Sequence, residues 1–148
     1  MYLSELKLWN FRKHGIGGGS IESSPPGLTI QFHEGMNVLI GENDSGKTAI
    51  VDAIRYTLGT QSREWIRLDE SDFHTESGHR AEELKIECIF RGLTDQEAGR
   101  FLEWLGNEDV EGVKRYVLKV SYTARNKGNR IVTDLRAGQD STGTPIDG

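Results

Sequence analysis

The sequence predicts an α/β domain in which a strand leads directly into a helix. Residues 38–40, Val-Leu-Ile, form a short apolar run typical of a strand buried on both faces. Apolar side chains then recur at helical spacing over residues 50–58, and Gly59 stands where a helix commonly ends. Apolar and polar residues alternate over 28–33 and 84–90, which predicts two half-buried strands. A chain of 148 residues is long enough to bury one core of this kind.

Three further elements are expected around this unit. An apolar stretch over residues 6–11 predicts an N-terminal strand. Thr94 and Glu97 have the spacing of a capping box, and they predict a helix that Gly106 ends. Residues 116–136 have the pattern of a hairpin. We therefore expect the strand that precedes the first helix to lie in a central sheet, and the other strands to form a mixed or antiparallel sheet.

The distribution of charge limits the kinds of partner. The net charge is −5, which argues against a protein that binds nucleic acid by electrostatics alone. Residues 64–83 contain seven acidic and two basic residues, whereas residues 112–136 contain seven basic residues and one acidic residue. Two solvated faces explain this distribution, and a phosphate-facing basic surface is the alternative.

The cellular location is predicted from the lack of any long apolar segment in the sequence. No apolar run reaches the length of a membrane span, and Glu5 and Lys7 stand where a signal peptide would be apolar. The single cysteine, Cys88, leaves no partner for an internal disulfide and suits the cytoplasm. We expect a cytoplasmic protein with no membrane partner.

Residues 41–48, GENDSGKT, match the P-loop pattern G-x-x-x-x-G-K-[ST]. The match lies between the expected buried strand and the expected helix, which is the context that its mechanism needs. The candidate nucleotide-binding residues of the motif are Gly41, Asn43, Asp44, Ser45, Gly46, Lys47 and Thr48. A glycine-rich surface turn with an exposed lysine is the alternative.

The residue types of this motif suit a nucleoside triphosphate. Glycines 41 and 46 permit a tight turn and a close approach of the backbone to phosphate, and the helix N-terminus adds N–H donors and partial positive charge. Lys47 would contact the β- and γ-phosphates, and the Thr48 hydroxyl would bind Mg²⁺. The guanine-reading pattern Asn-Lys-x-Asp is incomplete, because Asn129 stands at its last position. The expected cofactors are therefore ATP and Mg²⁺.

Several segments together resemble one family. Residues 10–12 read Asn-Phe-Arg, residues 32–41 lead through an apolar run into the P-loop, and the P-loop string is GENDSGKT. This arrangement resembles the N-terminal lobe of the SMC, RecF and OLD (overcoming lysogenization defect) ATPases, a branch of the ABC-type ATP-binding fold. The helix segment 49–54 and the Asp-Phe-His segment 72–74 look most like the OLD endonucleases.

The resemblance implies further contacts and partners. Arg12 and Lys13 become candidate contacts to the phosphates or the adenine, with a solvated strand end as the alternative. Asp72 could lie near the metal, although an exposed loop acid is the favoured interpretation. In such proteins ATP binding would drive the dimerisation of complete ATPase heads, and would gate a nuclease that acts on DNA and lies elsewhere in the protein.

The sequence also departs from the family pattern. ABC-type hydrolysis needs an apolar strand that ends in Asp-Glu, but Asp134 follows Ile131-Val132 and precedes Leu135. The Leu-Ser-Gly-Gly-like signature and the acids of a Toprim nuclease are not found in the sequence. We therefore expect residues 1–148 to be one ATP-binding lobe, with the rest of the ATPase and the nuclease absent.

Three functions remain in view. The first is the ATP-binding lobe of an OLD-type, ATP-dependent DNA endonuclease. The second is the head of an SMC- or RecF-type DNA-repair ATPase without a nuclease, and the third is a non-catalytic nucleotide-binding interaction module. The spacing of His74, Glu76 and His79 matches no metal motif, so this segment is expected to be a solvated loop.

Overall fold

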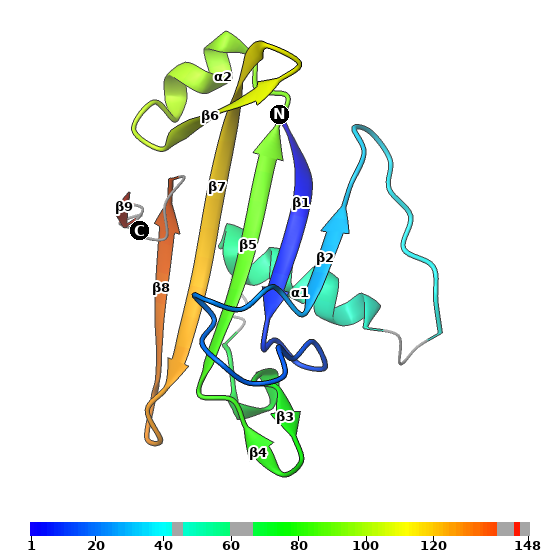
Figure 1. Ribbon diagram of the computed structural model, residues 1–148, viewed down its shortest axis with the longest axis vertical. Coiled ribbons are helices and arrows are strands. Elements are labelled where there is room, and N and C mark those ends of the chain that lie inside the picture. The colour runs from blue at the N-terminus through cyan, green and yellow to red at the C-terminus, as the bar shows by residue number, and fades with distance from the viewer. Residues whose placement is uncertain (43–45, 60–66, 139–143, 146–148) are drawn as a thin grey trace.

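The computed structural model describes residues 1–42, 46–59, 67–138 and 144–145. In these residues a seven-stranded sheet runs with all neighbouring strands antiparallel (Figure 1). Its strands are β1 (Tyr2–Trp9), β2 (Leu28–Gln31), β5 (Glu83–Arg91), β6 (Leu105–Val110), β7 (Val113–Asn126), β8 (Ile131–Ala137) and β9 (Thr144–Pro145). The order across the sheet is β2-β1-β5-β7-β8-β9, and β6 pairs with β7. The antiparallel sheet expected from the sequence is confirmed.

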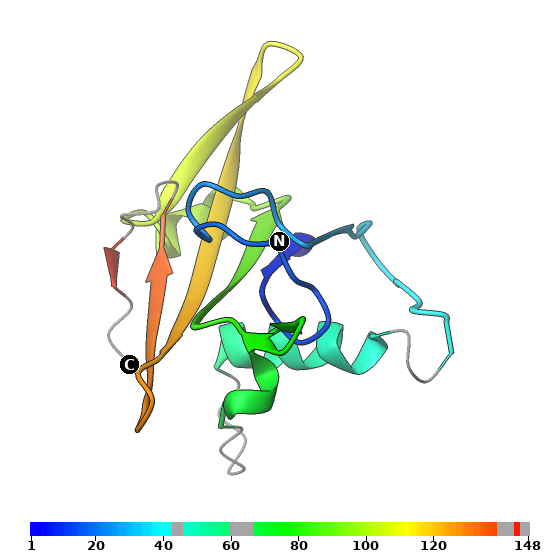
Figure 2. The ribbon, with the colours of Figure 1, turned by 60° about the horizontal axis from the view of Figure 1, so that its bottom comes forward.

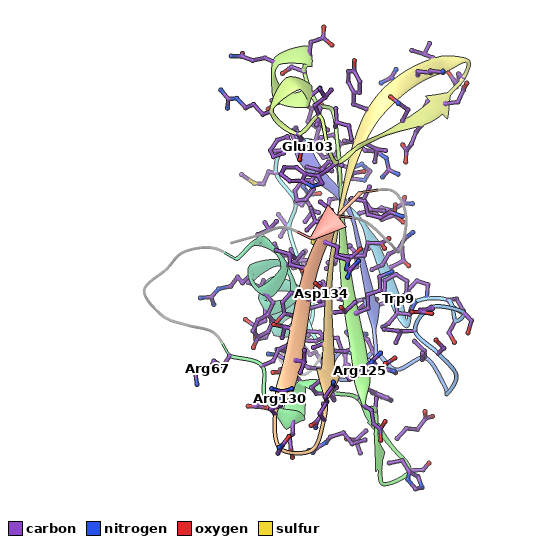
Figure 3. All side chains as sticks on the ribbon, turned by 90° about the vertical axis from the view of Figure 1, so that its left-hand side faces the viewer. Trp9, Arg67, Glu103, Arg125, Arg130 and Asp134 are labelled. Atoms are coloured by element: carbon purple, nitrogen blue, oxygen red, sulfur yellow. The ribbon has the colours of Figure 1, made fainter. Side chains whose placement is uncertain are left out.

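One helix, α1 (Lys47–Leu58), covers one face of this sheet. The view along the sheet shows α1 on one side and Trp9 on the other (Figure 3). The helix buries the residues of one face against apolar side chains of β1, β5 and β7, which is the pattern that helical spacing predicts. The buried residues of α1 are Ala49, Ile50, Ala53 and Thr57. The facing strands contribute Leu6, Leu8, Leu84, Ile86, Cys88 and Ala124.

Short elements fill the connections. They are the 3₁₀ turn η1 (Glu70–Asp72), the hairpin of β3 (Thr75–Glu76) with β4 (His79–Arg80), and α2 (Asp95–Arg100). Neither helix among the described residues has the length and apolar character that a membrane crossing requires.

The helix predicted to start at Thr94 forms, but it is shorter than expected. Thr94 and Glu97 make both hydrogen bonds of the capping box. The helix ends at Arg100 rather than at Gly106, because Leu105 and Gly106 already pair with Leu118 and Val117 of β7. The pairing of Leu105 with β7 therefore outweighs the helical spacing of that residue.

The prediction of a buried strand at residues 38–40 is wrong. This segment has no strand in the structure, and the side chains of Val38 and Ile40 are 69% and 90% exposed. A strand needs a neighbour for its N–H and C=O groups, and within the described residues β2, which leads into this segment, pairs only with β1. Figure 1 shows the segment leaving the end of β2 and running apart from the sheet to the start of α1.

Candidate functional site

The start of α1 lies within the P-loop motif, at Gly46 and Lys47. Gly46 is the N-cap residue and lies in the left-handed region, with φ +91°. This conformation favours glycine, and a residue without a side chain also supplies no capping group of its own. Asn43, Asp44 and Ser45, which were predicted to bind nucleotide, lie outside the described residues.

The last two residues of the motif, Lys47 and Thr48, follow this glycine on α1. Lys47 is the first residue of α1, and its Nζ donates a hydrogen bond to the carbonyl of Gly41, across the six-residue span of the loop. Thr48 follows on the helix and is exposed. A cationic amine and a hydroxyl therefore flank the N-terminus of a twelve-residue helix, where backbone N–H groups attract anions.

Lys13 and His14, from the turn after β1, also lie against Gly46. If Gly46 carried a Cβ, that atom would stand 2.6 Å from Cε and 3.2 Å from Nζ of Lys13, and 3.3 Å from Nε2 of His14. A side chain at position 46 would therefore displace the end of the Lys13 side chain, and the φ angle favours glycine there. The role of Lys13 as a contact to the phosphates or the adenine stays a prediction.

Arg12 is held by two carboxylates. Its Nη2 lies 2.8 Å from Oδ2 of Asp52 on α1, and its Nε lies 3.0 Å from Oδ1 of Asp72. Burial lowers the pKa of the Arg12 guanidinium, but the hydrogen bonds to Asp72 and Asp52 outweigh this effect and the pKa is raised overall. The expectation of Asp72 as an exposed loop acid is wrong, because the residue is only 4% exposed and bonds to Arg12.

Backbone hydrogen bonds fix the turn that carries these residues. The Arg12 N–H donates to the carbonyl of Asp72 at 2.7 Å, and the His74 N–H donates to the carbonyl of Asn10 at 2.9 Å. Phe11 is fully buried between them and meets Tyr56 of α1 edge-on, with ring centroids 6.2 Å apart. Figure 2 shows this dark-blue turn reaching down to α1.

Sequence reasoning missed Asp52 and His14. The Arg12–Asp52 ion pair joins residues forty positions apart, and no spacing rule links a turn to the second turn of a later helix. His14 belongs to no motif of the sequence, and its position two residues after Arg12 is the signal that could have found it.

The opposite face of the sheet carries much of the charge. The basic stretch predicted over residues 112–136 is partly neutralised there, because Arg125 pairs with Glu83 and Arg136 Nε lies 2.7 Å from Asp134. Figure 3 labels Arg125 and Asp134 on β7 and β8. A groove of about 450 Å³ lies over these strands, and none of the described P-loop residues lines it. Its size alone therefore does not make it the nucleotide site.

The segment from His74 to His79 forms no metal centre in the described part of the chain, where no group of three candidate ligands is found. His74 instead places Nδ1 2.7 Å from the carbonyl oxygen of Arg12. Glu76 and His79 are exposed residues that pair across the β3–β4 hairpin. His74 therefore supports the turn after β1.

An antiparallel sheet covered by a helix that starts at a P-loop is the N-terminal lobe of a P-loop ATPase of the ABC/SMC type. Residues 5–144 match the family model of an AAA domain, and the chain belongs to that family.

Similar proteins agree with this assignment. The chain is 30% identical over 115 residues to the chromosome partition protein Smc of Fusobacterium nucleatum, covering 78% of this chain and 9% of that protein. It is 39% identical over 64 residues to the DNA replication and repair protein RecF of Clostridium novyi, covering 43% of this chain and 15% of that protein. It is 29% identical over 87 residues to the DNA double-strand break repair Rad50 ATPase of Pyrococcus abyssi, covering 58% of this chain and 9% of that protein. The chain thus spans only a small part of these relatives.

A solved structure shares the fold. It comes from work on ATP-driven dimerization and DNA stimulated activation of SMC ATPases, and it superposes with a TM-score of 0.62 at 18% identity. The superposition covers 99% of this chain and 73% of the solved chain.

Proposed function

We propose that residues 41–48 bind MgATP, and that this chain is the nucleotide-binding lobe of a longer, DNA-associated ATPase of the SMC, RecF and Rad50 kind. The observation that carries the proposal is the start of α1. There a left-handed Gly46 opens a helix N-terminus that Lys47 flanks, and both residues belong to the P-loop motif.

The residues of this site fit the phosphates of a nucleotide. Glycine at position 46 keeps a side chain out of the helix start, where Lys47 begins α1 and the amine of Lys13 lies close by. Lys47 would leave the Gly41 carbonyl to contact the β- and γ-phosphates, since a phosphate is the stronger acceptor for an ammonium group. Thr48 would hold Mg²⁺ through its hydroxyl, and the ion would neutralise charge on the phosphate oxygens.

Arg12 has a different part in this proposal. Its guanidinium is bonded to Asp52 through Nη2 and to Asp72 through Nε. We infer that Arg12 primarily holds the turn that carries Lys13 against Gly46.

The exposed apolar segment before the P-loop supports the proposal that residues outside this chain complete the lobe. Met36 and Ile40 are 91% and 90% exposed, and no strand of the described residues ends in Asp-Glu for hydrolysis. We propose that a strand outside this chain pairs with residues 36–40 and brings the hydrolytic acid. The proteins named in the comparisons act in chromosome partition and DNA repair, which favours DNA and a second ATPase head as the partners of the complete protein.

The OLD endonuclease assignment is the finer candidate within this class. It is favoured by the P-loop string and by residues 72–74, whose Asp72 and His74 both hold the turn after β1. A non-catalytic nucleotide-binding module is the candidate of a different kind, and it would bind ATP without turnover even beside a second head.

The test is the affinity of the chain for MgATP, measured by titration calorimetry. Lys47→Ala should weaken binding at least about tenfold, because a hydrogen bond between charged groups contributes about 1.5–3 kcal/mol. Lys114→Ala removes the same charge from an exposed position on β7 and should leave the affinity unchanged. Undiminished binding by Lys47→Ala would refute the site.

A further inference from the structure

The groove of about 450 Å³ over β7 and β8 has one wall that comes from a distant part of the chain. Ile21 and Glu22, in the loop between β1 and β2, line it together with residues of β5, β7 and β8. The indole N–H of Trp9 donates to the carbonyl of Ser24 at 2.9 Å, and this bond holds the loop against β1. The volume lies within the range of roughly 300–1,000 Å³ that is usual for ligand sites.

The floor of this groove, the β7–β8 groove, carries side chains of both charges on one face of the sheet. Lys85, Thr123 and Asp134 lie side by side across β5, β7 and β8. Glu83 and Arg125 are the next pair on the same face, and they form an ion pair. Cations, anions and a hydroxyl group therefore lie close together along the floor.

Positive charge exceeds negative charge in the described lining of the groove, which has four basic and three acidic residues. Arg125 and Arg136 pair with acids of the lining, and Nζ of Lys85 lies 3.1 Å from Oε2 of Glu87. Lys127 also lines the groove and is exposed, and no ion pair holds it among the described residues. A ligand can therefore pair with Lys127 without first breaking an ion pair of the described chain.

The mixture of charges limits the kind of ligand. A nucleic acid presents a continuous run of phosphate anions, which Glu22, Glu83 and Asp134 would repel. A peptide backbone offers N–H donors as well as C=O acceptors, so it can bond to carboxylates and to cations in the same groove. Carboxylate side chains on such a peptide would match the excess of positive charge and would pair with Lys127.

We propose that the β7–β8 groove binds a short extended segment of a partner protein that carries aspartate or glutamate side chains. The backbone of this segment would lie between the loop that carries Glu22 and the strands β7 and β8. An acidic side chain would pair with Lys127, and the hydroxyls of Ser121 and Thr123 would donate or accept hydrogen bonds along the floor. None of the described residues of the P-loop lines this groove, and the inference does not depend on nucleotide binding.

Fluorescence polarisation with a labelled peptide that alternates threonine with aspartate tests the proposal. A peptide that alternates threonine with lysine probes the opposite charge, and an oligothymidylate probes nucleic acid. We expect the chain to bind the acidic peptide at least about tenfold more tightly than either of the other two.

A charge reversal connects the binding to the groove. Lys127→Glu should weaken the binding of the acidic peptide about fivefold, because an attraction becomes a repulsion at an exposed position. Lys114→Glu makes the same change at an exposed position of β7 outside the groove, and should leave the affinity unchanged. Amide NMR of the ¹⁵N-labelled chain should show shifts at Glu22, Thr123 and Val132 when the acidic peptide is added.

Three results would overturn the proposal. The first is an acidic peptide that does not bind, or that binds no more tightly than the basic one. The second is an equal loss of affinity in Lys127→Glu and Lys114→Glu, because the net charge of the chain rather than the groove would then set the affinity. The third is tighter binding of the oligothymidylate with shifts at the same amides, which would assign the groove to nucleic acid instead.

Discussion

The two segments that flank the P-loop differ in how the rest of the domain holds them. Helix α1 follows the loop, and its Ala53 is fully buried against the sheet. Residues 36–40 precede the loop, and the side chains of Met36 and Ile40 are 91% and 90% exposed. Both segments are apolar in sequence, so hydrophobicity alone does not tell which one the domain buries.

The difference follows from where each backbone finds its hydrogen bonds. A helix pairs its own N–H and C=O groups, and it needs only an apolar surface to pack against. A strand must pair with a neighbour, and among the described residues none reaches positions 38–40. One flank of the P-loop is therefore packed against the sheet, whereas the other flank has no strand partner among the described residues.

The largest expected effect tests the folded side of this comparison. Phe11→Ala should lower the free energy of unfolding by about 3–5 kcal/mol, because it leaves a cavity beneath the turn and α1. Urea unfolding followed by circular dichroism measures the change. A loss below about 1 kcal/mol would mean that Phe11 is not part of the core.

A smaller effect is expected at the ion pairs that join the turn to α1. Asp72→Ala should lower the free energy of unfolding by about 1–3 kcal/mol, because Arg12 keeps Asp52 but loses one of its two carboxylates, and water screens part of the effect. Glu76→Ala removes an exposed acid nearby and should stay within about 0.5 kcal/mol. Equal effects of the two substitutions would contradict the buried role of Asp72.

Almost no effect is expected on the exposed side. Ile40→Ser should change the free energy of unfolding by less than about 0.5 kcal/mol, because the side chain is already in water. The same urea titration measures it. A loss above about 2 kcal/mol would show that residues 36–40 are packed, and the contrast between the two flanks of the P-loop would disappear.

Thiol alkylation sharpens the same comparison without any change in stability. Burial raises the pKa of the Cys88 thiol to about 12, so at pH 8 almost no thiolate is present in the folded chain. Iodoacetamide should therefore leave the original chain unmodified, whereas the variant M36C should take up one label rapidly at that exposed position. Mass spectrometry counts the labels. Rapid labelling of Cys88 in the folded chain would contradict its burial on β5.

The sequence predicted the elements whose signals are local. The strands β1, β2 and β5, the hairpin of β7 and β8, and the capping box at Thr94 all depend on alternation or on spacing of a few residues. The start of a helix at Gly46 could be predicted for the same reason, because the P-loop motif itself marks where a helix begins.

The errors concern contacts between distant parts of the chain. The strand at 38–40 depends on a neighbour, and the end of α2 depends on the pairing of Leu105 with β7. Within the site, the burial of Asp72 and the position of His14 depend on the turn after β1. Residues 72–74 hydrogen-bond to this turn although they lie about sixty positions further along the chain. No local pattern encodes such contacts, so only the folded chain reveals them.

The measurement that tests the central claim most directly is a titration of the ¹⁵N-labelled chain with MgATP, followed by amide NMR. The account predicts shifts at Gly46, Lys47 and Thr48, which lie at the start of α1, and at Lys13, whose amine lies against Gly46. The amides of the β6–β7 hairpin should not move. Shifts confined to that hairpin or to the groove over β7 and β8, or no shifts at all, would contradict a nucleotide site at the start of α1.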